Sequence, residues 1–425
     1  MRRSIKISRN LDWITVSLYF LLIALGWMNI YAVVYNPEAQ QSIFDLSINS
    51  GKQLIWIGTA VLLIIVLVVV DYKIYDSLAY IIYGGVLLLL IGTLLFASPI
   101  KGSRSWLEIG SSDFRIQPAE FAKFATALAA SKFLSSINLR QQNLRDQLTL
   151  AAITFVPPLI IILQNETGSA LVFAAFLLAY YREGMSPVIL IIGGAGAAIA
   201  VLTLIVPQLY LLVGITLLMA IILGLNRRVL KRHLVSVALI YMAVIGTVMS
   251  VDYFVENILQ EHQQNRIHAL INPEADPRGA GWNVIQSKIA IGSGGFFGKG
   301  FLEGTQTKFD FVPEQSTDFI FCTIGEEHGW IGSIILIALF MLLLMRVVYI
   351  AERQKSVFGR TYGYCVASII FFHFLVNVGM TIGLAPVVGI PLPFFSYGGS
   401  SLWSFTILLF ILLSIDTYRK QELDR

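Results

Sequence analysis

The chain has 425 residues, of which 56% are hydrophobic and 13% are charged, and its mean hydropathy is +0.74. Soluble domains carry about 25% charged residues, so this composition excludes an ordinary soluble protein and predicts an all-α polytopic membrane protein. We interpret the net charge of +4 as membrane topology and not as nucleic-acid binding, because basic residues near helix ends orient membrane spans.

Membrane-length apolar segments follow one another along most of the chain. The hydrocarbon core of a bilayer requires about 20 apolar residues in a helix. In chain order, we predict helices near residues 12–34, 52–70, 77–98, 118–136, 147–164, 167–181, 187–206, 208–225, 234–251, 317–346, 361–383 and 399–418. The first is too long for the core of a signal peptide, so we expect it to be retained. The pattern therefore predicts about 12 transmembrane helices.

Basic residues are distributed unevenly between alternate connections. If the N-terminus is cytoplasmic, the inner connections collect Lys73, Lys132, Arg140, Arg145, Arg182, Arg227, Arg228, Lys231, Arg232, Arg346, Arg353, Lys355, Arg360, Arg419 and Lys420. The positive-inside rule then predicts that both termini are cytoplasmic. It places residues 98–117, the polar segment 252–316 and the turn 386–396 outside. We expect these three outer segments to form one site.

The segment 252–316 is too varied in composition to be a linker. Linkers are monotonous and poor in aromatic residues, whereas this segment combines charged groups and glycines with aromatic residues such as Trp282 and Phe297. We therefore predict a large extracytoplasmic loop that folds and binds a ligand. The glycines from Gly292 to Gly300 can present backbone amides to phosphate. Turns between short helices explain them equally well, and neither nucleotide-loop motif is satisfied.

Ionisable residues inside the predicted spans are candidates for function, because burying each one in a bilayer costs about 2.5–3.5 kcal/mol on insertion scales. Glu120 and Lys123 share one helical face and can neutralise each other. A structural ion pair and a substrate-facing role are equally compatible with this spacing. Glu326 and Glu327 are adjacent, so they point about 100° apart and at most one of them faces a given cavity.

Cysteine and histidine positions do not suggest a zinc site. Cys322 and Cys365 both fall in predicted spans, which indicates neither a disulfide framework nor a metal centre. His268 and His328 lack a partner at metal-ligand spacing, so packing in the core or at the interface is the simpler account.

Six motifs at the predicted outer segments carry a family resemblance. They are Lys101-Gly102-Ser103-Arg104-Ser105-Trp106; Gln117-Pro118-Ala119-Glu120-Phe121-Ala122-Lys123; Asp276-Pro277 with Gly279-Ala280-Gly281; Gln286-Ser287-Lys288-Ile289-Ala290-Ile291-Gly292; Gly304-Thr305-Gln306 with Pro313-Glu314, Thr317-Asp318 and Gly325-Glu326-Glu327; and Pro391-Leu392-Pro393-Phe394 with Ser396-Tyr397-Gly398-Gly399-Ser400. Together they resemble the SEDS family of bacterial cell-wall proteins over nearly the whole chain. The run that ends in Gly304-Thr305-Gln306 is more similar to the elongation branch of that family than to the division branch.

The resemblance implies a peptidoglycan glycosyltransferase in the bacterial cytoplasmic (inner) membrane. Such an enzyme polymerises lipid II into glycan strands on the outer face of that membrane during cell elongation and works with a class B penicillin-binding protein, a transpeptidase. Two features depart from the family. Asn165-Glu166 replaces the usual Pro-Asp pair, and the family has about ten spans, so residues 208–251 are interpreted as an inserted helix pair that preserves topology.

The resemblance also implies roles for individual residues. Asp276 is the expected general base, although an aspartate before proline is also common in turns. Lys101, Arg104 and Lys288 are expected to bind the pyrophosphate, although lone basic residues at span ends often contact lipid headgroups instead. Further candidates for substrate binding are Gln286, Glu314, Asp318 and Ser396. The two acidic residues of this set are also ordinary helix caps.

Cofactor use follows from the chemistry of the implied reaction. A divalent cation, Mg²⁺ or Mn²⁺, shared between pyrophosphate and a carboxylate is compatible with phosphate chemistry. No organic cofactor and no nucleic-acid partner are expected.

Three functions from different classes remain open at this point. The first is the polymerase, the second a lipid II transporter (flippase), and the third a noncatalytic scaffold for a class B penicillin-binding protein. A transporter needs a hydrophilic path across the membrane, for which Glu120, Lys123, Glu326 and Glu327 are available. A scaffold needs close helix contacts at small residues. Neither has a particular need for a carboxylate, cations and glycines on one outer face, so this combination favours the polymerase.

Overall fold

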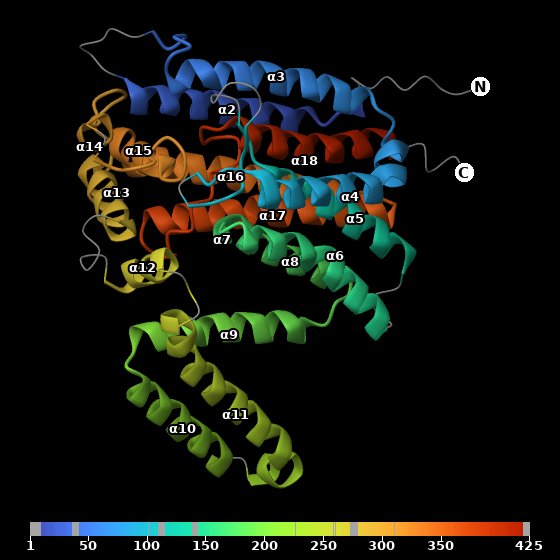
Figure 1. Cartoon of the computed structure of the whole chain (residues 1–425), viewed down its shortest axis with the longest axis vertical. Coiled ribbons are helices and arrows are strands. Elements are labelled where there is room, and N and C mark those ends of the chain that lie inside the picture. The colour runs from blue at the N-terminus through green and yellow to red at the C-terminus, as the bar shows by residue number, and fades with distance from the viewer. Residues whose placement is uncertain are drawn as a thin grey trace. The chain divides into compact units, whose positions relative to one another are not determined.

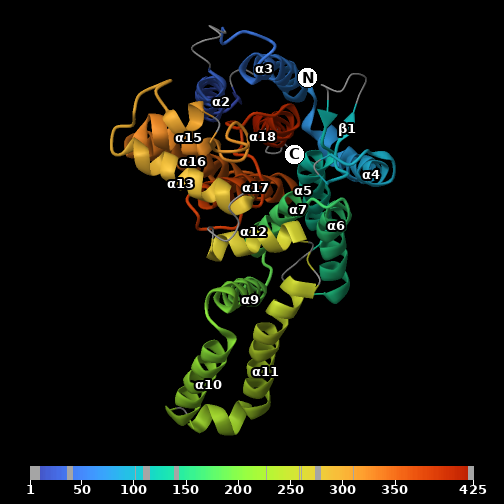
Figure 2. The same cartoon turned by 60° about the vertical axis from the view of Figure 1, so that its left-hand side comes forward.

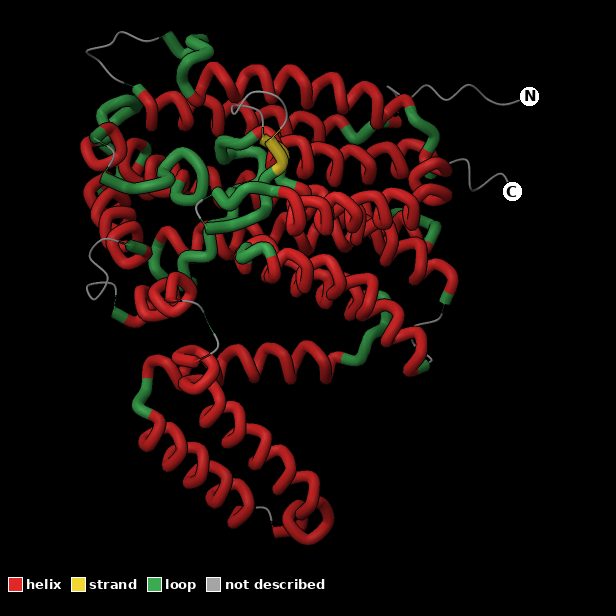
Figure 3. Tube along the Cα trace, in the orientation of Figure 1, coloured by secondary structure: helices red, strands yellow, loops and turns green. Residues whose placement is uncertain are grey.

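The structure is a computed structural model that describes residues 10–35, 42–100, 102–108, 115–137, 143–225, 227–257, 259, 261–272, 279–309 and 311–419. It is built almost entirely of helices (Figures 1 and 3). The chain divides into two compact units, Met1–Met185 with Asn283–Arg425, and Ser186–Trp282.

The first unit contains most of the long helices. They are α2 (Trp13–Val34), α3 (Asn49–Val69), α4 (Tyr72–Phe96), α5 (Pro118–Ser136), α6 (Leu144–Leu163), α7 (Thr167–Leu171), the 3-10 segment η2 (Val172–Ala175), α8 (Phe176–Arg182), α13 (Ala280–Gly294, from Asn283 onward), α14 (Thr305–Lys308), α15 (Ile320–Glu327), α16 (Gly329–Glu352), α17 (Val357–Thr381) and α18 (Gly399–Tyr418). A short antiparallel pair, β1 (Leu107–Glu108) and β2 (Arg115–Ile116), precedes α5.

The second unit consists of α9 (Pro187–Ile205), α10 (Gln208–Leu225), α11 (Arg227–Asn257) and α12 (Glu261–Ile271). Two hydrogen bonds join α10 to α11: Gln208 Nε2 donates to the carbonyl of Val248 at 3.2 Å, and the hydroxyls of Thr216 and Tyr241 lie 2.9 Å apart. Residues 208–251 therefore do form a helix pair. Its status as an insertion stays a prediction.

Each of the twelve predicted segments is mainly helical, although 317–346 is divided into two helices, and the prediction of an all-α membrane protein is confirmed. Eight helices in the described part of the chain are long and apolar enough to cross a membrane: α2, α3, α4, α6, α9, α16, α17 and α18. Shorter apolar helices cover Thr167–Arg182, Gln208–Ile221 and Val237–Val251. The chain is thus a multi-pass membrane protein.

Helix starts follow ordinary capping chemistry. The side chain of Asp12 accepts a hydrogen bond from the amide of Thr15 at the start of α2, and Ser356 caps α17 by accepting from the amide of Gly359. These contacts satisfy amides that have no partner within the helix. Pro118 occupies the first turn of α5, where its missing amide hydrogen is not needed.

The predicted helix 317–346 differs from the structure, which has two helices with a break at His328. Gly329, the first residue of α16, has φ +63°, a conformation that glycine adopts without strain. A Cβ at this position would lie 2.4 Å from the amide nitrogen of Gly298, so the turn after α13 packs directly on the break. Glu326 and Glu327 consequently belong to α15 and precede the span of α16.

The core of the first unit forms around α18. Every residue from Leu408 to Tyr418 is buried, and the aromatic rings of Tyr19, Phe394 and Phe405 pack nearby. Alanines on α5 allow the neighbouring helices to approach it closely, as is usual where helices pack inside a membrane. The other faces of α3 and α4 expose large apolar side chains such as Leu62 and Leu88, which suits contact with lipid.

Helices of the first unit run alternately in opposite directions, so its connections collect at two ends (Figures 1 and 2). We call one the loop end; its described residues are 97–100, 102–108, 115–117, 164–166, 295–309, 311–328 and 382–398. The other is the arginine end, with residues 10–12, 182–183, 346–360 and 416–419. Most of the irregular backbone of the unit lies at the loop end (Figure 3).

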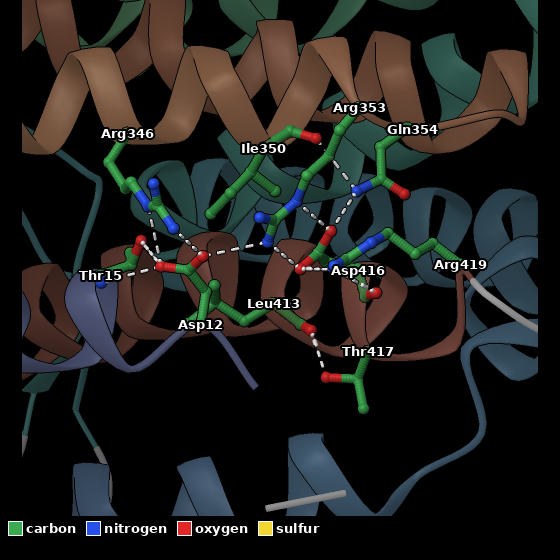
Figure 4. Close-up of polar contacts among 10 residues, drawn as sticks. All are labelled: Asp12, Thr15, Arg346, Ile350, Arg353, Gln354, Leu413, Asp416, Thr417 and Arg419. Atoms are coloured by element: carbon green, nitrogen blue, oxygen red, sulfur yellow. Dashed lines mark hydrogen bonds and ion pairs between the residues drawn. The ribbon is translucent and has the colours of Figure 1, made fainter. Parts of the chain in front are cut away.

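Ion pairs fasten three helices together at the arginine end (Figure 4). Arg353 donates to both Asp12 and Asp416, Arg346 donates to Asp12 at 2.7 Å, and Arg419 donates to Asp416 at 2.6 Å. The two aspartate side chains are 3% and 0% exposed. Burial raises the pKa of Asp12, but hydrogen bonds from Arg346 and Thr15 outweigh it and lower the pKa to about 2. The Asp12 carboxylate therefore remains charged at neutral pH.

Candidate active site

The predicted site residues fall into two sets. Asp276 and Lys101 lie outside the described residues. The others lie in the first unit, at the loop end or directly beneath it: Arg104, Glu120, Lys123, Gln286, Lys288, Glu314, Asp318, Glu326 and Ser396.

Glu120 and Lys123 form the predicted ion pair near the start of α5. Lys123 Nζ donates to Glu120 Oε2 at 2.8 Å, and the two side chains are 1% and 2% exposed. The ammonium also lies 2.9 Å from Nε2 of His373 on α17 and 4.8 Å from the ring centroid of Phe405 on α18. A buried charge of this kind is tolerated only with such partners. The pair is thus the centre of a network that joins three helices.

Glu166 is a carboxylate beside this pair that the sequence analysis did not assign to the site. Its Oε1 accepts from Ser169 Oγ at 2.6 Å and from Gln117 Nε2, while its buried Oε2 has no hydrogen-bond partner among the described residues. Burial raises the pKa of Glu166 and outweighs the lowering effect of hydrogen bonds with Ser105 and Ser169, so the net shift is upward. Since Glu166 stands where the family has aspartate, a carboxylate is retained at that place in the polar network.

The segment that carries Arg104 is held against the end of α6. The amide of Arg104 donates to the carbonyl of Gln164 at 3.0 Å, and Ser103 Oγ donates to the same carbonyl. The side chain of Arg104 is exposed at the loop end. Among the described residues no carboxylate pairs with it, so its charge is accessible to an anionic ligand.

Two of the predicted outer segments contact the residues that directly follow the 386–396 turn. The amide of Gln117 donates to Ser400 Oγ at 3.1 Å, and the amide of Tyr397 donates to the carbonyl of Ser316 at 2.9 Å. Residues 98–117, the end of the long loop and the start of α18 after the 386–396 turn are therefore neighbours. That they form one site stays a prediction.

Ser396 holds two of these segments together. Its hydroxyl donates to the carbonyl of Thr317 at 2.6 Å and accepts from the amide of Leu392 at 2.8 Å. Asp318 and Glu314 lie in the adjoining turn before α15, where Glu314 has φ +54° and is exposed. The predicted cap position belongs instead to Phe319, because α15 begins at Ile320. Substrate binding by these three residues stays a prediction.

Gln286 and Lys288 lie on α13 with different exposure. Gln286 is buried, and the neighbouring Ser287 Oγ donates to the carbonyl of Thr381 at 2.8 Å, which fastens α13 to the end of α17. Lys288 is exposed and its side chain runs beside Gly383. No carboxylate pairs with Lys288 in the part of the chain that the structure describes, so it offers a second accessible cation at the loop end.

Glu326 organises the loop between α13 and α14. Its carboxylate is fully buried and accepts hydrogen bonds from the amides of Thr305, Gln306 and Thr307 and from Lys299 Nζ at 2.6 Å. Burial raises the pKa of Glu326, but these hydrogen bonds outweigh it and the net shift is downward. The carboxylate thus provides acceptors for the backbone amides of the first turn of α14, and these contacts within the chain occupy both of its oxygens.

Glu327 is the contrasting neighbour. Its Oε1 accepts from the amide of Leu302 at 3.2 Å, whereas its buried Oε2 has no partner among the described residues. Burial, with the nearby charge of Glu326, raises the pKa of Glu327 to about 7. This carboxyl group therefore titrates in the neutral range.

A pH-dependent stability follows from this shift. Because the folded state holds the proton of Glu327 more tightly than the unfolded state, its stabilisation is fully present below the ordinary pKa of 4.5 and is lost as pH rises through about 7. In the wild-type chain we expect the free energy of unfolding to fall by about 3 kcal/mol as pH rises between these values. We expect this fall to be absent in Glu327→Gln, which has no carboxyl group at that position. Unfolding titrations in detergent micelles at several pH values test this. An unchanged pH dependence in the variant would contradict it.

Metal ligands do not gather in the described part of the structure. No group of three or more His, Cys, Asp or Glu side chains comes together there with the geometry to hold an ion. We therefore derive no step through a protein-built metal site.

The chain matches known proteins over almost its whole length. It matches the FtsW, RodA and SpoVE family of cell cycle proteins over residues 12–213 and 195–421. It is 32% identical to the peptidoglycan glycosyltransferase RodA of Treponema pallidum, with 96% of this chain and 98% of that protein covered. It is 31% identical to the peptidoglycan glycosyltransferase MrdB of Escherichia coli, with coverage of 94% and 93%.

A solved structure has the same fold. It is one chain in a structure that describes how a peptidoglycan synthase complex coordinates polymerisation and crosslinking, and it matches with a TM-score of 0.67 at 27% identity. The match covers 97% of this chain and 99% of that one. The sequence motifs, the fold and these similarities agree, and the chain belongs to the SEDS family, that of FtsW, RodA and SpoVE.

Proposed function

We propose that this chain is a peptidoglycan glycosyltransferase that polymerises lipid II during cell elongation. The observation that carries the proposal is its identity of 31–32% to two peptidoglycan glycosyltransferases over more than nine-tenths of each protein. The loop end adds chemical support, because it presents accessible cations above a buried polar network.

The reaction requires a base and a means of stabilising the leaving group. A sugar hydroxyl of one lipid-linked disaccharide attacks the anomeric carbon of another, the hydroxyl proton is removed, and lipid pyrophosphate leaves. We assign proton removal to Asp276. Arg104 and Lys288 are assigned to the pyrophosphate because both are exposed at the loop end without a carboxylate partner among the described residues. Lys101 is assigned with them from its motif.

The buried network beneath the loop end is assigned to the polar part of the substrate. Lys123 supplies an enclosed positive charge, and Glu166 supplies a carboxylate oxygen without a partner in the described chain. Sugar hydroxyls and phosphates can form hydrogen bonds or ion pairs with such groups, whereas lipid tails cannot. Glu120 pairs with Lys123 and offsets its charge.

We assign the arginine end to the cytoplasm and the loop end to the outer face of the bacterial inner membrane. Arg182, Arg346, Arg353, Arg360 and Arg419 all lie at the arginine end, and cytoplasmic ends of membrane helices are enriched in such residues. Both termini are then cytoplasmic. The partner we propose is a class B penicillin-binding protein, in keeping with the peptidoglycan synthase complex to which the fold is similar.

A divalent cation, Mg²⁺ or Mn²⁺, is proposed as an ion that the substrate pyrophosphate brings to the site and shares with a carboxylate. Its chemistry would be to neutralise charge on the leaving group. Chelation with EDTA is expected to stop polymerisation, and added Mg²⁺ or Mn²⁺ to restore it.

The direct test is polymerisation of labelled lipid II by the purified chain, together with its penicillin-binding protein carrying an inactivated transpeptidase site. Glycan strands resolved on a gel are the expected product. A parallel assay follows lipid II across vesicle membranes. Translocation without strands would favour the transporter, and neither activity would favour the scaffold.

A further inference from the structure

Two polar residues on one face of α17 reach the same outer turn. His373 and Asn377 are four residues apart, so they lie one above the other on the helix. Both are fully buried. Asn377 Nδ2 donates to the carbonyl of Ile390, and His373 Nδ1 lies 3.1 Å from the carbonyl of Pro391. The face therefore holds two consecutive carbonyls of the turn that continues to Ser396.

The second nitrogen of His373 faces the buried ion pair. Its Nε2 lies 2.9 Å from Lys123 Nζ, and Lys123 also donates to Glu120. A carbonyl can only accept a hydrogen bond and an ammonium group can only donate one. His373 must therefore be neutral, with its proton on Nδ1 and a free lone pair on Nε2 for the ammonium group.

This arrangement fixes the direction of the Lys123 ammonium group. An ammonium group has three donors, and in the described part of the chain Glu120 and His373 take two of them. Phe405 closes another side, since its ring lies 4.8 Å both from Lys123 Nζ and from the centroid of the His373 ring. The third donor has no hydrogen-bond acceptor among the described residues, so it is available to a polar group of the substrate.

We propose that His373 is a positioning residue for glycan polymerisation. By accepting a hydrogen bond from Lys123, it directs the third donor of the Lys123 ammonium group towards the substrate, and it links this orientation to the turn at Pro391. The inference rests on the proposed polymerase function. A role in packing alone would need the ring but not the Nε2 acceptor, so the two nitrogens can be tested separately.

Two amide variants separate the nitrogens. In His373→Gln the amide reaches the position of Nε2 and can accept from Lys123. In His373→Asn it reaches only the position of Nδ1 and can donate to Pro391. With the partner present, we expect the Gln variant to polymerise lipid II within about threefold of wild type and the Asn variant to lose about tenfold or more, because small errors of positioning are costly in rate. Thermal unfolding in detergent is measured on both.

A second background tests whether the effect passes through Lys123. When each is combined with Lys123→Met, His373→Gln and His373→Asn should show equal residual rates of polymerisation. The amide of the Gln variant then has no ammonium group from which to accept a hydrogen bond. Rates that differ there by as much as in the wild-type background would overturn the proposal.

Three further outcomes would overturn the positioning role or the proposed function. Equal rates for Gln and Asn in the wild-type background would overturn the positioning role, as would an Asn variant that loses activity only because it unfolds at a lower temperature than the Gln variant. A wild-type chain that makes no glycan at all would overturn the proposed function itself, and the inference with it.

Discussion

Replacing Asp276 with alanine is expected to reduce the rate of lipid II polymerisation by about 10²- to 10⁴-fold, the usual contribution of a general base. The residue precedes α13, the helix that carries Lys288. The measurement is the initial rate of glycan formation from labelled lipid II by the purified chain with its transpeptidase-inactive partner. Asp276→Asn should behave in the same way, because an amide keeps the shape of the side chain but cannot take the proton.

Glu274 provides the matched control, since it carries the same charge two residues earlier. Glu274→Ala should stay within about threefold of wild type, as expected for a group outside the proton transfer. If folded Asp276→Ala retained nearly full activity, the aspartate would be only a turn residue. Another carboxylate would then have to supply the base.

Removing Arg353 is expected to destabilise the fold by about 3–5 kcal/mol, because it leaves two buried aspartates short of their shared positive partner. Arg353 donates to Asp12 and Asp416, whose side chains are 3% and 0% exposed. Arg353→Met keeps much of the side-chain volume and removes only the charge and its hydrogen bonds. The free energy of unfolding is measured in mixed detergent micelles, by titration with a denaturing detergent.

Arg182 serves as the control for the same end of the molecule. It also pairs with a carboxylate, Glu352, at 2.9 Å, but both side chains are nearly half exposed. Exposed pairs contribute about 1 kcal/mol or less, so Arg182→Met should have a small effect. Equal losses in the two variants would show that burial of the aspartates does not determine the result.

The helical framework could be predicted from sequence because membrane helices must satisfy their backbone internally and must be long enough to cross the bilayer. The segment 118–136 was predicted with the same ends that α5 has. The break at His328 was not, because hydropathy continues across it and only the conformation of Gly329 reveals it. Short-range spacing also predicted the Glu120–Lys123 pair.

Long-range partners were beyond the reach of the sequence. His373 lies 250 residues from Lys123, and Asp12 lies 341 residues from Arg353. His373 is also an ionisable residue within a predicted span and so a candidate for function, but no charged residue lies near it in the sequence to suggest its partner. Glu166 was noticed as a departure from the family pattern. Nothing in the sequence showed that its carboxylate is buried and bonded to Gln117 and Ser169.

The charged contacts at the arginine end bear on how the molecule can change shape. Asp12 precedes α2, Arg346 and Arg353 belong to the end of α16, and Asp416 is on α18. These charged contacts hold the three helices together at that end, which acts as a pivot. Separating the helices there would leave two buried carboxylates without their positively charged partners. The helices can separate more easily at the opposite end, where their separation would admit a bulky lipid-linked sugar. An alternating-access cycle would have to open both ends in turn, which makes the charged pivot an energetic obstacle to transport but not to polymerisation on one face.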